Sequence, residues 1–213
     1  MLKNKKEKKK KKMTEENGIK VILVGASGTG KTNIIKALVD KPFEESSEST
    51  LTSTFVSKRV NVNNKDYQLE IWDTAGQEMY KSLTKIFLVN SKIVIFVYDI
   101  TQKSSFEELD FWINTAKENL DNTAIYAIFA NKKDLYLNEE VTEEEGAKKA
   151  EEIGAFFRET SAKTERENLN QYLDDLTKEY VKKYGNNEEK GHRELSFALQ
   201  YDRDTNKKRN CCK

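Results

Sequence analysis

Thiols, imidazoles and long apolar stretches are scarce in this sequence, and each scarcity excludes a class of protein. Among 213 residues there are two cysteines, Cys211 and Cys212, and one histidine. A disulfide framework and a metal site built from cysteine or histidine are therefore not expected. No run approaches the roughly 18 apolar residues of a membrane-spanning helix, and no secretory signal opens the chain. We expect a cytosolic compartment.

Charge is balanced overall but unevenly distributed. The net charge is +1, yet residues 1–12 contain eight lysines and one glutamate, and residues 203–213 are also basic, which leaves the middle acidic. Basic ends on an acidic body favour contact with an anionic membrane surface over nucleic-acid binding. For 1–12 itself, a solvated, disordered lysine run is the simpler interpretation. We expect a basic, disordered extension over 1–17, a folded domain over 18–184 and a flexible tail over 185–213.

Apolar runs alternate with amphipathic stretches from residue 19 onward. The runs at 19–25, 92–100 and 124–132 are typical of strands buried on both faces of a sheet. Residues 54–73 indicate two strands joined by a tight turn at 63–64. Together these patterns predict an α/β fold, a doubly wound and mostly parallel six-stranded sheet with one antiparallel hairpin strand at its edge and helices on both faces.

Three predicted helices begin with a hydroxyl residue followed three positions later by glutamate, the pattern of the capping box. These pairs are Ser105 with Glu108, Thr142 with Glu145 and Thr164 with Glu167. The last helix has one apolar face. That face consists of Leu169, Leu173, Leu176 and Tyr180.

The segment GASGTGKT at 25–32 matches the phosphate-binding loop G-x-x-x-x-G-K-[ST], after a strand and before a helix. Its glycines allow backbone N–H groups to surround phosphate oxygens, Lys31 can reach the terminal phosphates, and Thr32 can ligate Mg²⁺. A glycine-rich turn that binds nothing is the alternative. The candidate phosphate-binding residues are Gly25, Ala26, Ser27, Gly28, Thr29, Gly30, Lys31 and Thr32.

The segment WDTAGQE at 72–78 follows the second hairpin strand. Asp73 at the strand end is suited to hold Mg²⁺ through water, and Gly76 offers an unobstructed backbone N–H. Gln77 is suited to orient a water molecule in line with the terminal phosphate. In isolation D-x-x-G is a common turn, but beside the phosphate loop it predicts a hydrolytic site.

The segment NKKD at 131–134 follows the strand predicted at 124–132. Asp134 can accept hydrogen bonds from N1–H and the 2-amino group of guanine, which adenine does not offer in that arrangement. ETSAK at 159–163 follows the next short strand, and the N–H of Ala162 can meet guanine O6. These motifs predict guanine selectivity.

In this order, the motifs identify the chain as similar to small GTPases of the Ras superfamily, most of all the Rab family. The resemblance covers about 19–184, includes VYDIT at 97–101, and extends to the terminal cysteines. It implies that Thr50 joins Thr32 on Mg²⁺ and senses the γ-phosphate, that Phe43 packs over the guanine and that Lys132 runs beneath it. The other guanine-site residues that the motifs imply are Asn131, Ser161 and Lys163.

By this resemblance the chain is a GTP/GDP switch that hydrolyses GTP to GDP and phosphate with Mg²⁺. Its partners would be a nucleotide exchange factor, a GTPase-activating protein, effectors that bind the two switches, and prenylation escort or GDP-dissociation-inhibitor chaperones. The first arginine is Arg59, so none precedes Thr50 to serve as a built-in arginine finger. Intrinsic turnover is then expected on the order of 10⁻⁴ s⁻¹, as in Ras without its activating partner.

The paired cysteines near the end resemble those that carry two geranylgeranyl groups in Rab proteins. Two lipids and nearby lysines provide stable anchoring, which a single lipid does not. Cys211 and Cys212 are therefore expected to attach the chain to the cytoplasmic face of an intracellular membrane, from which it cycles to the cytosol. The last four residues, NCCK, do not form the CaaX box typical of Ras and Rho proteins.

Two segments depart from the Rab pattern. LTSTF at 51–55 retains only the phenylalanine of the usual Ile-Gly-Val-Asp-Phe, and FLVNS at 87–91 replaces Tyr-Tyr-Arg-Gly-Ala. Because these segments form the surface that effectors and exchange factors read, they leave partner identity open. Other branches of the superfamily, a nucleotide-bound scaffold without turnover, and an ATPase or nucleotide kinase remain alternatives.

Overall fold

The computed structural model describes residues 18–44, 54–74 and 81–185. Several sequence predictions fall outside these ranges. They concern the basic extension, Thr50, Gly76, Gln77, Cys211, Cys212 and the tail.

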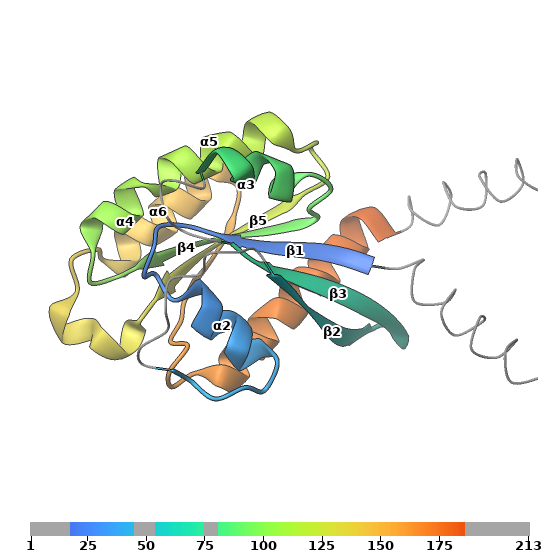
Figure 1. Cartoon of the computed structure of the whole chain (residues 1–213), viewed down its shortest axis with the longest axis horizontal. Helices are drawn as coiled ribbons and strands as arrows, with labels where there is room; N and C mark the ends of the chain where they lie inside the picture. Colours follow the sequence, from blue (N-terminus) through green and yellow to red (C-terminus); the bar gives the residue numbers. More distant parts are fainter. Residues whose placement is uncertain (1–17, 45–53, 75–80, 186–213) are drawn as a thin grey trace, which may run out of the picture.

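The described residues form one six-stranded sheet in the order β2-β3-β1-β4-β5-β6 (Figure 1). β2 pairs with β3 in antiparallel fashion, and the other neighbouring strands are parallel. The predicted α/β sheet with one antiparallel edge strand is confirmed. The strands are β1 (Gly18–Val24), β2 (Thr54–Val62), β3 (Lys65–Asp73), β4 (Ile93–Asp99), β5 (Ile125–Asn131) and β6 (Phe156–Glu159).

Helices cover both faces of the sheet. They are α2 (Lys31–Leu38), α3 (Lys81–Leu88), α4 (Lys103–Glu107), α5 (Leu109–Asn119), the 3-10 helix η2 (Lys133–Asn138), α6 (Glu143–Ile153) and a last helix over 166–185. In Figure 1, α2 and the orange last helix lie on one face, and α3 and α5 lie on the other. None of the described helices is long and apolar enough to cross a lipid bilayer.

Alternate residues of the central strands supply two separate cores, because successive strand side chains point to opposite faces. In β1, Val21 and Leu23 pack toward α2 and the last helix, whereas Ile22 and Val24 pack toward α3 and α5. All seven residues of β4 are buried, as expected for a central parallel strand. The predicted apolar face of the last helix lies in the first core and is 4% exposed or less.

The β2–β3 turn has two asparagines in the left-handed region, with φ of 52° at Asn63 and 62° at Asn64. Two such residues form a tight turn that matches the twist of an antiparallel pair, and asparagine tolerates this region better than most residues. The hairpin prediction is therefore confirmed at the predicted turn.

Two of the three capping predictions need correction. Thr142 and Glu145 form the capping box at the start of α6. However, Ser105 lies inside α4, whose N-cap is Gln102, and its hydroxyl bonds the backbone of Gln102 and Asp99. The last helix begins at 166, so Thr164 lies two residues before it rather than at its N-cap.

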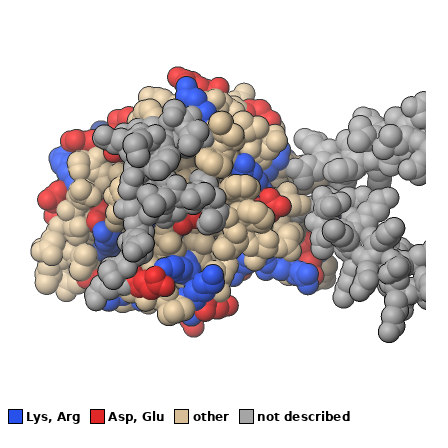
Figure 2. Space-filling view, viewed as in Figure 1, with Lys and Arg blue, Asp and Glu red and all other residues tan. Residues whose placement is uncertain are grey.

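The face shown in Figure 2 carries basic and acidic side chains interspersed over the described surface. Such mixing is typical of a solvated surface whose charges neutralise each other locally.

Candidate nucleotide site

The predicted site segments all follow the carboxyl ends of parallel strands. The loop 25–30 follows β1, Asp73 ends β3, Asn131 ends β5 and the segment 160–163 follows β6. Since these ends meet at one edge of the sheet, the fold gathers residues far apart in sequence into one place.

The loop between β1 and α2 closes around the side chain of Lys31. Its Nζ donates hydrogen bonds to the carbonyls of Gly25 at 2.8 Å and Ala26 at 2.7 Å. The lysine is only 5% exposed. Burial lowers the pKa of Lys31 to about 8, although the nearby carboxylates of Asp73 and Glu108 oppose this shift. A buried ammonium group at the base of the loop favours binding of an anion.

Two glycines of the loop are required by close contacts. A Cβ atom at Gly25 would lie 2.1 Å from the carbonyl oxygen of Val97, and φ there is +150°. A Cβ atom at Gly30, where φ is +93°, would lie 2.3 Å from Nδ2 of Asn131. Ser27 and Gly28 form the exposed tip, while Ala26 and Thr29 are buried. The backbone therefore approaches its neighbours more closely than any larger residue permits.

Thr32 and Asp73 come together although they are 41 positions apart. The Thr32 hydroxyl donates to Oδ2 of Asp73 at 2.8 Å, and Asp73 is 6% exposed. Hydroxyl and carboxylate oxygens are ligands that Mg²⁺ prefers, usually with oxygens from substrate phosphates and water. No group of three or more His, Cys, Asp or Glu side chains suited to a metal occurs in the described ranges. The pair therefore fits Mg²⁺ held partly by a phosphate ligand.

Asn131 connects the phosphate loop to the loops of the predicted base site. Its Nδ2 donates to the carbonyl of Thr29 at 2.8 Å, and its Oδ1 accepts hydrogen bonds from the Thr160 hydroxyl at 3.3 Å and the Ala162 N–H at 3.2 Å. Asn131 is 1% exposed. The Asn131 side chain therefore joins the end of β5 to the phosphate loop and to the segment after β6. Direct contact of Asn131 or Ala162 with guanine stays a prediction.

Ser161 orients Asp134. The Ser161 hydroxyl donates to Oδ1 of Asp134 at 2.6 Å and accepts hydrogen bonds from the N–H groups of Lys163 at 3.3 Å and Thr164 at 3.1 Å. One hydroxyl thus joins the carboxylate at the start of η2 to the turn after β6. This arrangement holds a half-buried carboxylate at the edge where a base is predicted to bind.

Phe43 lies beside Lys163, which follows the Ser161 turn. The Nζ of Lys163 is 5.8 Å from the centroid of the Phe43 ring, a cation–π distance. Phe43 is 39% exposed, so its ring is accessible to a ligand. A partly exposed aromatic face of this kind is suited to packing against a heteroaromatic base.

The family model for the Ras family matches residues 20–182 of the chain. The chain belongs to the Ras family. It is 36% identical over 178 residues to the Ras-related protein Rab-2B of Dictyostelium discoideum, covering 84% of this chain and 88% of that protein. It is 41% identical over 145 residues to RHN1 of Nicotiana plumbaginifolia and, equally, to Rab5 of Nicotiana tabacum, covering 68% of this chain and 72% of each relative.

As a member of this family, the chain is a small GTPase of the Ras superfamily, most like Rab proteins, and the guanine-nucleotide prediction from the motifs is confirmed at family level. The roles of individual residues stay predictions that the geometry above supports.

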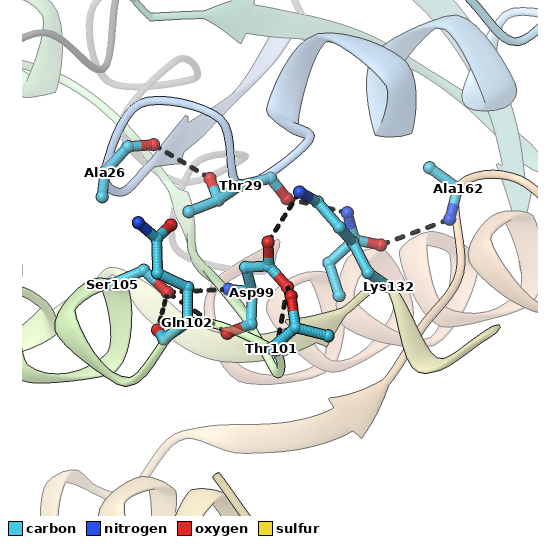
Figure 3. A network of polar contacts seen from close by, with 9 residues as sticks. Ala26, Thr29, Asp99, Thr101, Gln102, Ser105, Lys132 and Ala162 are labelled. Atoms are coloured by element: carbon cyan, nitrogen blue, oxygen red, sulfur yellow. Dashed lines mark hydrogen bonds and ion pairs between the residues drawn. The ribbon is translucent and has the colours of Figure 1, made fainter. Parts of the chain in front are cut away.

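The sequence motifs do not predict one ion pair of this small GTPase. Nζ of Lys132 lies 2.6 Å from Oδ2 of Asp99, a side chain that is 5% exposed (Figure 3). Asp99 is paired with Asn131 in the register of β4 and β5. The signal in the sequence was the aspartate of VYDIT at the end of an otherwise apolar strand, where a buried carboxylate needs partners.

Three aromatic side chains form a second feature that the motifs did not predict. Phe55 stacks on Trp72 with ring centroids 5.1 Å apart, and Phe87 lies 6.1 Å from Trp72. Phe55 is 52% exposed, and Ile86 and Val89 beside Phe87 in sequence are also exposed. We call Phe55, Trp72 and Phe87 the aromatic patch. It is formed by β2, β3 and α3, which adjoin in sequence residues 45–53 and 75–80, the segments with Thr50 and Gln77 that the family resemblance predicts to be the two switches.

Proposed function

We propose that this small GTPase is a Rab-type switch that regulates membrane trafficking from the cytoplasmic face of an intracellular membrane. The main support is the meeting of three units at one sheet edge: the Lys31 loop, the Thr32–Asp73 pair and the Asp134–Ser161 pair. In this proposal they bind, in that order, the phosphates, a metal ion and the base of a guanine nucleotide.

In this proposal Lys31 and the loop N–H groups stabilise negative charge on the β- and γ-phosphates as the terminal phosphoryl group is transferred to water. Thr32, Thr50 and Asp73 hold Mg²⁺, which neutralises developing phosphate charge when it is bound. Gln77 orients the attacking water, and the Gly76 N–H contacts the γ-phosphate. Asp134 binds the base, with Ser161 fixing its carboxylate.

Slow turnover follows from the positions of the arginines. Among the described residues, Arg59 lies far along β2 from the site. It pairs with Gln68 of β3, whereas Thr54, five residues earlier in β2, pairs with Asp73 at the site. Five strand residues span roughly 17 Å. The guanidinium group of Arg158 donates a hydrogen bond to the carbonyl of Phe157, and that of Arg166 donates one to the carbonyl of Ala37. We therefore assign the missing positive charge to a GTPase-activating protein.

The aromatic patch supports effector binding next to the switches. Phe55 and Trp72 present a stacked, partly exposed aromatic surface, and aromatic residues dominate the energetic centres of protein interfaces. We infer that effectors and exchange factors read this patch together with the switch segments. Phe55 and Phe87 belong to the segments 51–55 and 87–91 that depart from the Rab pattern, so we expect partner choice to depend on these two segments.

The tail supplies membrane attachment in this proposal. Cys211 and Cys212 carry geranylgeranyl groups, escort and GDP-dissociation-inhibitor chaperones shield them, and nucleotide state decides when the chain leaves the membrane. Neighbouring basic residues of the tail add attraction to anionic lipids.

Two comparisons in cells test this function. A fluorescently tagged chain is expected to label an intracellular membrane, and the Cys211→Ser/Cys212→Ser double variant is expected to be diffuse. A variant lacking residues 2–12 is the matched control for basic attraction alone and is expected to retain its membrane. Identical distributions of the wild type and the double cysteine variant would contradict anchoring, while GTP hydrolysis by the purified chain tests the switch separately.

A further inference from the structure

We propose that Asp99 is a positioning residue for nucleotide retention, acting through Lys132. The inference rests on the proposed function, because it concerns how long the same site holds a guanine nucleotide. It assigns a role to a buried carboxylate that the phosphate, metal and base motifs do not include.

Both oxygens of the Asp99 carboxylate are committed. Oδ2 contacts the Lys132 ammonium at 2.6 Å, while Oδ1 accepts hydrogen bonds from the N–H of Thr101 at 2.9 Å and its hydroxyl at 2.8 Å. The side chain is 5% exposed. A carboxylate held by two neutral donors on one side has little freedom to follow a moving lysine. Lys132 is therefore fixed by Asp99, rather than the reverse.

The backbone of Asp99 is fixed as well. Its N–H donates to the Ser105 hydroxyl at 3.0 Å, and that hydroxyl donates to the carbonyl of Gln102 at 2.7 Å. The next backbone N–H, of Ile100, donates to the carbonyl of Asn131 at 3.1 Å. Hydrogen bonds thus join the end of β4, the first turn of α4 and the end of β5 into one unit around this carboxylate (Figure 3).

Lys132 is the part of this unit that the proposed function places against the nucleotide. Its backbone has φ of 69°, in the left-handed region, and its side chain extends across to Asp99 with Thr29 of the phosphate loop nearby (Figure 3). In the proposed function the lysine stem lies beneath the guanine. An ammonium anchored at its tip keeps the stem in the bound position before the nucleotide arrives, which lowers the entropy lost on binding and slows release.

The test measures GDP dissociation from the full chain with Mg²⁺, using fluorescent GDP chased by excess GDP. Asp99→Asn keeps the size and the acceptor for Thr101 but loses the charge that attracts Lys132. We expect it to raise the dissociation rate roughly tenfold, a loss in the range of one charge-assisted hydrogen bond. Lys132→Met is expected to raise the rate at least as much.

The combined variant distinguishes positioning from a structural role. If Asp99 acts through Lys132, adding Asp99→Asn to Lys132→Met leaves the rate within about twofold of Lys132→Met alone, because the two residues form one interaction. A multiplicative increase in the double variant, or an unchanged rate in Asp99→Asn, would overturn the proposal.

Glu159→Gln is the matched control. Glu159 forms a 2.8 Å ion pair with the adjacent lysine of the same loop, Lys133. We expect its loss to change GDP dissociation by less than about twofold, because this pair contacts neither Lys132 nor Asp99 and its lysine is largely exposed. An increase equal to that of Asp99→Asn would show a general loosening of the loop and would also overturn the proposal.

Folding and function are checked separately. If Asp99→Asn does not fold, Thr101→Val removes one donor to Oδ1, and it is expected to raise the rate severalfold in the wild type but not in Lys132→Met; no difference between the two backgrounds would overturn the proposal. Failure of the wild type to bind GDP at all would contradict the proposed function instead.

Discussion

The Ser161 hydroxyl donates a 2.6 Å hydrogen bond to Oδ1 of Asp134 and so fixes the carboxylate that we propose to bind the base. Replacing Asp134 with Asn puts an amide group where guanine presents its N1–H and 2-amino donors. We expect Asp134→Asn to weaken GDP binding by on the order of 10²-fold or more, because buried donors lose their acceptor. Competition binding with GDP and inosine diphosphate, which lacks the 2-amino group, measures the change.

The wild type is expected to prefer GDP over inosine diphosphate, and Asp134→Asn is expected to reduce that preference as well as the overall affinity. Full GDP affinity in the variant would contradict the role given to Asp134.

The hydroxyl of Thr32 is expected to matter through Mg²⁺. Thr32→Ala removes the group that bonds Asp73 Oδ2 at 2.8 Å, whereas Thr32→Ser retains it. We expect removal of Mg²⁺ with a chelator to speed GDP release strongly in the wild type and in Thr32→Ser, but far less in Thr32→Ala, whose release is already fast. Equal sensitivity to chelator in all three proteins would exclude Thr32 as a ligand.

Nucleotide affinity is expected to fall as the pH rises through the pKa of Lys31. That pKa is lowered to about 8 by burial, and an anionic phosphate raises it on binding because it stabilises the ammonium form. Above this pH the free protein must take up a proton to bind GDP, so affinity is expected to decrease roughly tenfold between about pH 7 and about pH 9.

Calorimetric titration in two buffers of different ionisation enthalpy measures this proton uptake directly. Lys31→Met is expected to bind more weakly and to lose the uptake. Proton release, or no uptake by the wild type near about pH 8.5, would contradict the assignment.

Gln77→Leu is expected to slow hydrolysis without weakening nucleotide binding. The amide orients the attacking water in the proposed mechanism, and loss of such positioning costs on the order of 10²-fold in rate. Single-turnover hydrolysis of preloaded GTP is the measurement, with GTP affinity as the internal control. Hydrolysis at the wild-type rate would remove Gln77 from the mechanism.

The sheet and the phosphate loop were predictable because their signals are local. The buried run of β4 and the G-x-x-x-x-G-K-T spacing each identify their own structure without information from elsewhere in the chain. The β2–β3 turn is likewise determined by two adjacent residues, Asn63 and Asn64.

The features that the sequence did not predict depend on tertiary contacts. Ser105 matches a capping pattern, yet its hydroxyl accepts the N–H of Asp99, six residues earlier at the end of β4. The role of Asp99 depends on the register that sets it beside Asn131, and the aromatic patch depends on packing of α3 against β3. Neither local propensity nor motif spacing specifies which residue of one strand lies opposite which residue of its neighbour.

Guanine selectivity of the purified chain is the most direct test of the proposed site. Labelled GDP bound with Mg²⁺ is competed with unlabelled GDP and with ADP over a range of concentrations. We expect ADP to compete on the order of 10³-fold less well than GDP or worse, because adenine leaves the Asp134 carboxylate without its donors. Displacement by ADP at the same concentrations as GDP would contradict the guanine site.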